Sequence, residues 1–343
     1  MAAHVTASPG KRPGLGAGDR VIMSLFLGGW GAFITYFSMV SHPQHFAKDL
    51  SYPWRAARAL LDGHDPYQVI QGLGAYPFNA PLFYPLPAAL VVMPVTWWRP
   101  EVGGAVFIGI SSSLLAFALL RESPQRLWVF ASAPFVHAAI LGQWAPLLTA
   151  AALMPTLQFA AAAKPTVGLV AWLYRPSWRG IAGGLVLLVI SLVLLPSWPT
   201  SWLEATASTA RYRGPATTLL GCFLLLGLLR WRRKEGRLIV SLALVPQLPV
   251  FYDALPLWLI PSTWLRSLLL SASSWIAYLL WYPFHKSPLQ NETAIPLALL
   301  FIWAPALILV LLLPNTTDSQ TGDDAWPRFL APLARFRRKG PPV

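Results

Sequence analysis

Long stretches without a charged side chain dominate this chain and limit what it can fold into. Windows at 21–47, 66–98, 102–120, 180–203, 267–285 and 293–317 contain no Asp, Glu, Lys or Arg. Each window can hold a helix of about 20 residues, which is the length that crosses the hydrocarbon core of a bilayer. Only 11% of all residues are charged, whereas soluble proteins average about 25%. The chain is therefore expected to be an integral membrane protein.

Further spans are predicted between these windows. The stretch 127–163 also lacks charge but contains Pro146 and Pro155, which predicts two short or broken spans. Additional spans fit at 157–174, 215–229, 238–252 and 254–265. The sequence thus predicts an all-α polytopic membrane protein with about 11–12 transmembrane helices.

The distribution of Lys and Arg predicts the orientation, because cytosolic segments carry an excess of positive charge. The tail 1–20 contains Lys11, Arg12 and Arg20 and should be cytosolic. If successive spans cross the membrane in alternating directions from this tail, the basic segments 175–179, 230–237 and 335–339 are cytosolic as well. Arg121 and Arg126 fall outside and count against this orientation locally. We attribute the net charge of +13 to this rule and expect no nucleic-acid partner.

This orientation divides the chain into three parts. A membrane domain at 21–313 lies between cytosolic tails at 1–20 and 314–343. Its first external loop, 41–79, is the largest loop. Within it we expect a short amphipathic helix at 52–62, with Ser51 as its cap and Gly63 at its end, resting in the headgroup layer.

Several segments in this order resemble glycosyltransferase family 87. They are an Asp directly after the first span, YPWRAARALLDGHDPY at 52–67, FYPLP at 83–87, LGQ at 141–143, AAAAKPTVGLVAWLYRPSWRG at 160–180 and QLPVFYDALPLWLIP at 247–261. The resemblance covers roughly 45–265. Two departures are the single proline after Tyr84, where the family usually has two, and a shortened stretch between Gln143 and Lys164.

The resemblance implies a bundle of the GT-C type with its active site at the external face of the cytoplasmic membrane. It also implies a polyprenyl-phosphate sugar as donor, with mannose expected, and an envelope glycolipid or glycan as acceptor. We expect no other cofactor. The chain contains no glycine motif for a nucleotide and no Asp-x-Asp pair for a metal-bound nucleotide sugar. The histidines show no metal-ligand spacing, so no metal site is predicted.

An inverting transfer needs a base for the acceptor hydroxyl and positive charge for the departing phosphate. The resemblance implies that Asp49 is the base, and a solvated loop aspartate is the alternative. Lys164 is singled out by its place in the sequence. It lies 11 residues before Arg175, or about 16 Å along a helix, and an ionisable group at that depth is functional by default. Snorkelling from a shorter helix is the alternative explanation.

Other polar residues complete the candidate site. Arg55 and Arg58 could meet the lipid phosphate or could only attract headgroups. Tyr252 and Asp253 lie at the expected external end of a span, where Asp253 could bind sugar hydroxyls or mark a helix boundary. Gln143 could contact substrate or hold helices together. For Asp62 and Asp65 we favour roles at a helix end and in a turn.

Two other functions stay open. A transporter or lipid flippase would also place a polar residue inside the membrane, but it predicts two similar halves, and no internal symmetry is visible. A non-catalytic membrane subunit would keep the fold and lose the chemistry.

Overall fold

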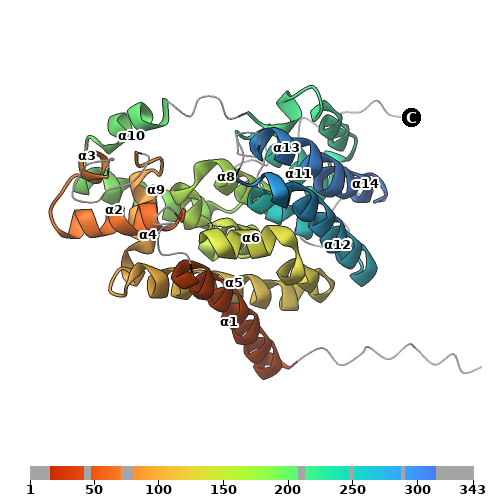
Figure 1. Ribbon diagram of the computed structural model, residues 1–343, viewed down its shortest axis with the longest axis horizontal. Coiled ribbons are helices and arrows are strands. Elements are labelled where there is room, and N and C mark those ends of the chain that lie inside the picture. Colours follow the sequence, from red (N-terminus) through yellow and green to blue (C-terminus); the bar gives the residue numbers. More distant parts are fainter. Residues whose placement is uncertain are drawn as a thin grey trace, which may run out of the picture.

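The chain folds into helices throughout the part that the computed structural model describes, residues 16–41, 48–70, 81–207, 213–246, 251–286 and 290–313. No strand occurs among these residues. The helices with α-helical geometry are α1 (Ala17–Ser41), α2 (Ser51–Leu61), α3 (Pro66–Val69), α4 (Leu86–Val92), α5 (Pro100–Glu122), α6 (Ala133–Leu141), α7 (Ala145–Leu153), α8 (Pro165–Tyr174), α9 (Trp178–Leu194), α10 (Trp198–Ala207), α11 (Lys234–Leu244), α12 (Trp264–Trp281), α13 (Gln290–Ala298) and α14 (Ala304–Leu311) (Figure 1).

Short helical segments of other geometry separate them. These are η1 (Met93–Val95), η2 (Pro124–Ala131), η3 (Pro155–Ala163), η4 (Pro215–Thr217), η5 (Cys222–Arg230), η6 (Phe251–Leu259), η7 (Tyr282–Phe284) and the π-helical η8 (Leu299–Trp303). Prolines begin η2, α7, η3 and α8 or lie in their first turn. Proline is tolerated at the start of a helix but not in its interior. The 33 prolines of the chain therefore keep most helices short.

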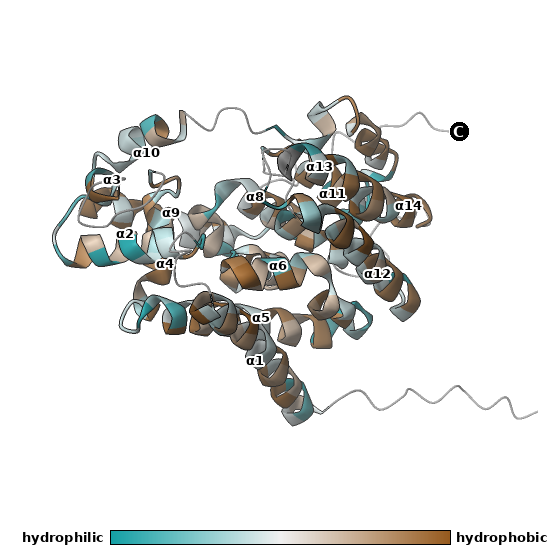
Figure 2. Cartoon of the chain, in the orientation of Figure 1, coloured by the Kyte–Doolittle hydropathy of each residue, from teal (hydrophilic) through white to brown (hydrophobic). Residues whose placement is uncertain are grey.

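Among the described residues, three helices are long and apolar enough to cross a membrane: α1, α5 and the run Glu292–Leu311. The pair α9 and α10 makes a fourth if its 98° bend belongs to one span. Figure 2 shows hydrophobic residues along α1, α12 and α14, while hydrophilic residues gather on α2 and α10. The protein is thus an all-α protein with several candidate membrane spans.

The longest helices, α1 and α5, pack antiparallel along small residues. Gly28 of α1 lies against Gly109 and Ser113 of α5, whereas Gly104 of α5 lies against Thr35 of α1. Small residues let two backbones approach closely where lipid supplies no hydrophobic drive. The end of α1 and the start of α5 therefore share one face of the molecule, which we call the site face. We call the opposite face, where α1 begins, the basic face.

On the basic face, the ends of segments that are far apart in sequence contact one another. Arg175 donates to Glu122 at 2.7 Å, and the buried Arg126 donates to the carbonyl of Pro261. Arg230 donates to the carbonyls of Leu311 and Leu313 at the end of α14. Arg121 and Arg126 thus lie on the same face as Arg175, so the prediction that they lie on the opposite side is wrong.

The prediction for Arg121 and Arg126 fails because of the window 66–98, which was predicted to contain a full span. Between residues 81 and 98 the structure has only the short run Leu86–Val95, which packs against α2 on the site face. Among the described residues, no helix of spanning length therefore lies between α1 and α5, where one was predicted. With this change the basic residues around Arg121 join the other basic segments, and the local violation of the charge rule disappears.

The amphipathic helix of the first loop is present as α2, but with different surroundings. Ser51 is its first residue, and the residue before it, Leu50, makes no side-chain cap. Gly63 ends the helix in the left-handed region, with φ +76°. Ala56 and Ala57 are buried against α3, α4 and Trp198. The helix thus packs into a satellite core instead of lying free among headgroups. Residues 42–47 and 71–79 of the predicted loop lie outside the described residues, as do residues 1–15 of the predicted N-terminal tail and all of the C-terminal tail 314–343. The rest of the N-terminal tail, from residue 17, belongs to α1.

Candidate active site

The turn 48–50 is fixed to the ends of α1 and α6. The buried Lys48 side chain donates to the carbonyl of Ile140 at 2.9 Å and to the hydroxyl of Ser38. The backbone N–H of Asp49 donates to the carbonyl of Leu141 at 3.0 Å. Asp49 is therefore positioned by main-chain contacts and by its neighbour, which leaves its carboxylate available.

A glycine turn places Gln143 beside this segment. Gly142 ends α6 with φ +65°, and the N–H of Gln143 donates back to the carbonyl of Ala138. This left-handed ending is the common way to close a helix. It directs the buried side chain of Gln143 toward Lys164, whose ammonium nitrogen lies 3.4 Å from the amide oxygen.

Lys164 lies at a break between two helices, η3 and α8. Its backbone is extended, with φ −140° and ψ 82°, because the following Pro165 disfavours the α-helical region. A continuous helix through 157–174 was predicted, and this part of the prediction is wrong. The ammonium nitrogen lies 2.7 Å from a carboxylate oxygen of Asp253 and 5.1 Å from the ring centre of Tyr252.

Asp49, Gln143, Lys164, Tyr252 and Asp253 together form what we call the site cluster. Burial raises the pKa of Asp49 to about 6, and the negative charge of Asp253 adds to this, while Lys164 acts in the opposite direction. Asp253 is only 4% exposed and is paired with Lys164, whereas Asp49 is partly exposed. Asp49 is therefore the carboxylate with the greater access to solvent.

Lys48 is a neighbour of the cluster that the sequence argument missed. Burial lowers its pKa to about 8, so it is still mostly a cation at neutral pH. A signal was available, because Lys48 directly follows a charge-free window of helical length and precedes Asp49.

The charged residues of α2 and the following turn have other partners. Arg58 and Asp62 form an exposed ion pair at 3.7 Å. The Asp65 side chain accepts the backbone N–H of Tyr67 and caps α3. These are the helix-end and turn roles predicted for Asp62 and Asp65. Arg55 is partly buried on the same helix. The charges that shift the pKa of Asp49 are those of Lys164 and Asp253, and neither arginine is among them.

The site cluster can exchange a proton at Asp49 and present one partly buried cation, the ammonium of Lys164. Within the described ranges no group of three or more His, Cys, Asp or Glu residues could hold a metal ion. Comparison with known proteins gives no match: no family model, no curated protein and no solved structure is significantly similar to this chain. Any functional assignment therefore depends on the chemistry of the site.

Proposed function

We propose that this protein is an integral membrane glycosyltransferase of the GT-C type. It would move a sugar, with mannose as the expected one, from a polyprenyl-phosphate donor to a glycolipid or glycan acceptor of the cell envelope. The main support is that Asp49 lies close enough to the Lys164–Asp253 ion pair for both charges to act on its carboxylate. Lys164 and Asp253 are 89 residues apart in sequence, and ionisable groups that gather in an otherwise apolar membrane protein mark functional sites.

The chemistry assigns a role to each group. Asp49 accepts the proton of the acceptor hydroxyl while the new bond from that oxygen to the sugar carbon forms. The bond from the sugar to the lipid phosphate breaks, and the phosphate leaves with its electron pair. Because the acceptor oxygen attacks the face of the sugar carbon opposite to the phosphate, the sugar configuration inverts. A general base works best when its pKa lies near the working pH, and the raised pKa of Asp49 meets this condition.

The phosphate side needs more positive charge than Lys164 alone supplies. Asp253 already balances the charge of Lys164, so the pair offers little net attraction for an anion. Arg55 or Arg58 on α2 would have to turn toward the phosphate when the donor binds. Gln143 and Tyr252 would then contact the sugar hydroxyls and the sugar ring.

The proposed architecture is a polytopic bundle of the GT-C type with the site face outside and, because the span predicted between α1 and α5 is absent from the described residues, with one pass fewer than the 11–12 predicted. The short segments from η2 onward would act as broken spans, which lipid tolerates where they are buried in protein. The basic face would be cytosolic, as the positive-inside rule requires, with both termini on that side of the cytoplasmic membrane. In a Cys222→Ser background, cysteines at Gly63 and Arg232 should label from opposite sides, Gly63 from outside. Labelling of both positions from one side would contradict this orientation.

The decisive test is Asp49→Asn in a transfer assay with polyprenyl-phosphate mannose in liposomes. Asn cannot accept the proton, so turnover should fall by about 10²–10⁴ while donor binding is kept. Asp62→Asn and Asp65→Asn are matched controls and should retain most activity. Wild-type turnover should rise with pH through about 6 as Asp49 loses its proton. Near-normal turnover of Asp49→Asn would remove Asp49 as the base.

A lipid transporter is the second candidate, because Lys164 lies at a helix break beside a buried carboxylate. Discontinuous helices that present ionisable groups are typical of transporter sites. Wild-type liposomes that move a labelled lipid phosphate across the bilayer, without transfer to any acceptor, would favour this function over the glycosyltransferase.

A further inference from the structure

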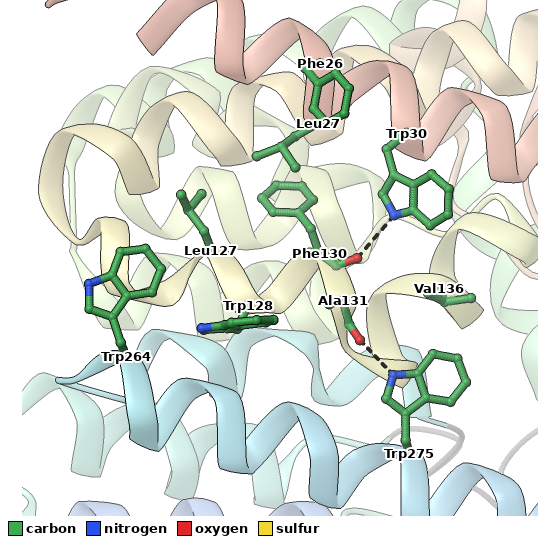
Figure 3. Close-up of a pocket in the computed structure, with 10 residues that line it drawn as sticks. All are labelled: Phe26, Leu27, Trp30, Leu127, Trp128, Phe130, Ala131, Val136, Trp264 and Trp275. Carbon is green, nitrogen blue, oxygen red and sulfur yellow. Dashed lines mark hydrogen bonds between the residues drawn. The ribbon is translucent and has the colours of Figure 1, made fainter. Parts of the chain in front are cut away.

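An aromatic groove lies on the side of the molecule between α1 and α12, toward the basic face. Its volume is about 600 Å³, within the usual range for small-molecule sites. Figure 3 shows its rings facing a common hollow from α1, η2 and α12. Its lining residues include Phe26, Leu27, Trp30, Trp128, Trp264 and Trp275.

Two backbone carbonyls beside the groove are satisfied by indole N–H groups from its wall. The helix η2 ends at Ala131, which frees backbone carbonyls beside the groove. The indole N–H of Trp30 donates to the carbonyl of Phe130 at 3.3 Å, and that of Trp275 donates to the carbonyl of Ala131 at 2.7 Å (Figure 3). An unsatisfied carbonyl in an apolar environment costs several kcal/mol. These bonds therefore leave a surface suited to a hydrocarbon chain.

The groove opens toward lipid. Phe26 is 73% exposed and Trp264 is 53% exposed, and both lie on helices with exposed apolar faces. A bilayer is the surrounding that such faces require.

Two arginines lie at the basic-face ends of α1 and α5. Gly28 of α1 lies against Ser113 of α5, and Arg20 and Arg121 are each eight residues nearer the basic face along these antiparallel helices. Arg20 lies seven residues before Leu27, so it shares the groove-facing side of α1. Neither arginine pairs with a carboxylate among the described residues.

We propose that this groove binds one anionic phospholipid from the leaflet at the basic face. One acyl chain would lie along the aromatic rings, and the phosphate would meet Arg20 and Arg121. Guanidinium groups bind phosphate well, so this charge pair favours an anionic headgroup over a neutral one. The proposal is independent of the transferase function, because the groove lies near the opposite end of α1 from Ser38 and the site cluster.

The test is native mass spectrometry of the full chain, purified with equal amounts of phosphatidylglycerol and phosphatidylcholine. Wild-type protein should retain one phosphatidylglycerol with a preference of about tenfold or more, since two cations near the headgroup each add roughly 1 kcal/mol. Arg20→Gln with Arg121→Gln should abolish this preference. Arg179→Gln with Arg232→Gln removes the same charge elsewhere on the basic face and should preserve it.

A second variant pair tests the groove itself. Phe26→Ala with Trp128→Ala removes two exposed rings, so the fold should survive, as circular dichroism can check, while retention of the lipid falls. Equal retention of both lipids by the wild type would overturn the proposal, as would equal loss of preference in the Arg179/Arg232 control. A wild-type dimer that disappears in the Phe26/Trp128 variant would instead assign the groove to a second copy of the chain.

Discussion

The α1–α5 pair and the region around the site cluster are built in opposite ways. The two long helices are continuous, nearly free of interior charge and held together by small residues such as Gly28 and Gly109. The site cluster is assembled from the ends of short segments: the turn after α1, the glycine ending of α6, the break before α8 and the first turn of η6. The long helices form a frame, and the breaks bring polar side chains together.

This difference has a physical reason. A continuous helix satisfies its own backbone hydrogen bonds and can face lipid without help. A helix end leaves N–H and C=O groups that must find partners, so a helix end at the depth of the hydrocarbon must be buried in protein or line a water-filled cavity. Side chains that leave from such ends, as Lys164 does, are surrounded by polar groups that can pair with them. The contrast predicts that substitutions in the site region cost stability through charge, and those in the frame through packing.

The largest effect is expected at the ion pair. Asp253→Asn leaves the ammonium of Lys164 without its partner, in a place where the Lys164 and Asp253 side chains are only 18% and 6% exposed. Breaking such a pair costs about 3–5 kcal/mol, which unfolding in detergent can measure. Replacing both partners, as Lys164→Met with Asp253→Leu, should recover much of that loss, because no unpaired charge is left. A double variant as unstable as Asp253→Asn alone would show that the lost charge pairing is not the cause.

The frame could be predicted from the sequence, because charge-free windows mark α1, α5 and the run Glu292–Leu311 directly. The number of passes before α5 could not be predicted from the sequence. Composition shows that the window 66–98 is free of charge, but not that its described part, residues 81–98, contains only a short helical run packed against α2. The sequence also could not identify Asp253 as the partner of Lys164, because only tertiary packing brings the two residues together. Asp49 was selected by resemblance, and its proximity to Lys164 and Asp253 became visible only in the structure.

A smaller effect is expected in the frame, from Gly28→Ala. A Cβ at this position would lie 1.9 Å from the hydroxyl of Ser113 and 2.7 Å from the carbonyl of Gly109, so α1 and α5 must move apart. Overpacking of this kind costs about 1–3 kcal/mol, measured by the same unfolding assay. Gly29→Ala is the matched control, because it meets nothing within 4 Å and should be neutral or mildly stabilising. Ser113→Ala should relieve part of the Gly28→Ala loss. Equal destabilisation by both alanines would rule out packing as the cause.

The smallest effect on stability, and the most informative about the site, is expected from Gly142→Ala. The left-handed conformation of Gly142 costs an alanine about 1–2 kcal/mol, and the new Cβ would lie 3.0 Å from that of Leu50, the neighbour of Asp49. Gly63 is also left-handed, but a Cβ there meets open space. Gly63→Ala should therefore cost similar stability without moving Asp49. In the transfer assay, kcat should fall severalfold for Gly142→Ala, with KM nearly unchanged. For Gly63→Ala, kcat should stay close to the wild-type value. If both variants lower kcat equally, strain at a helix end would explain the loss, and the glycine turn would have no part in positioning the base.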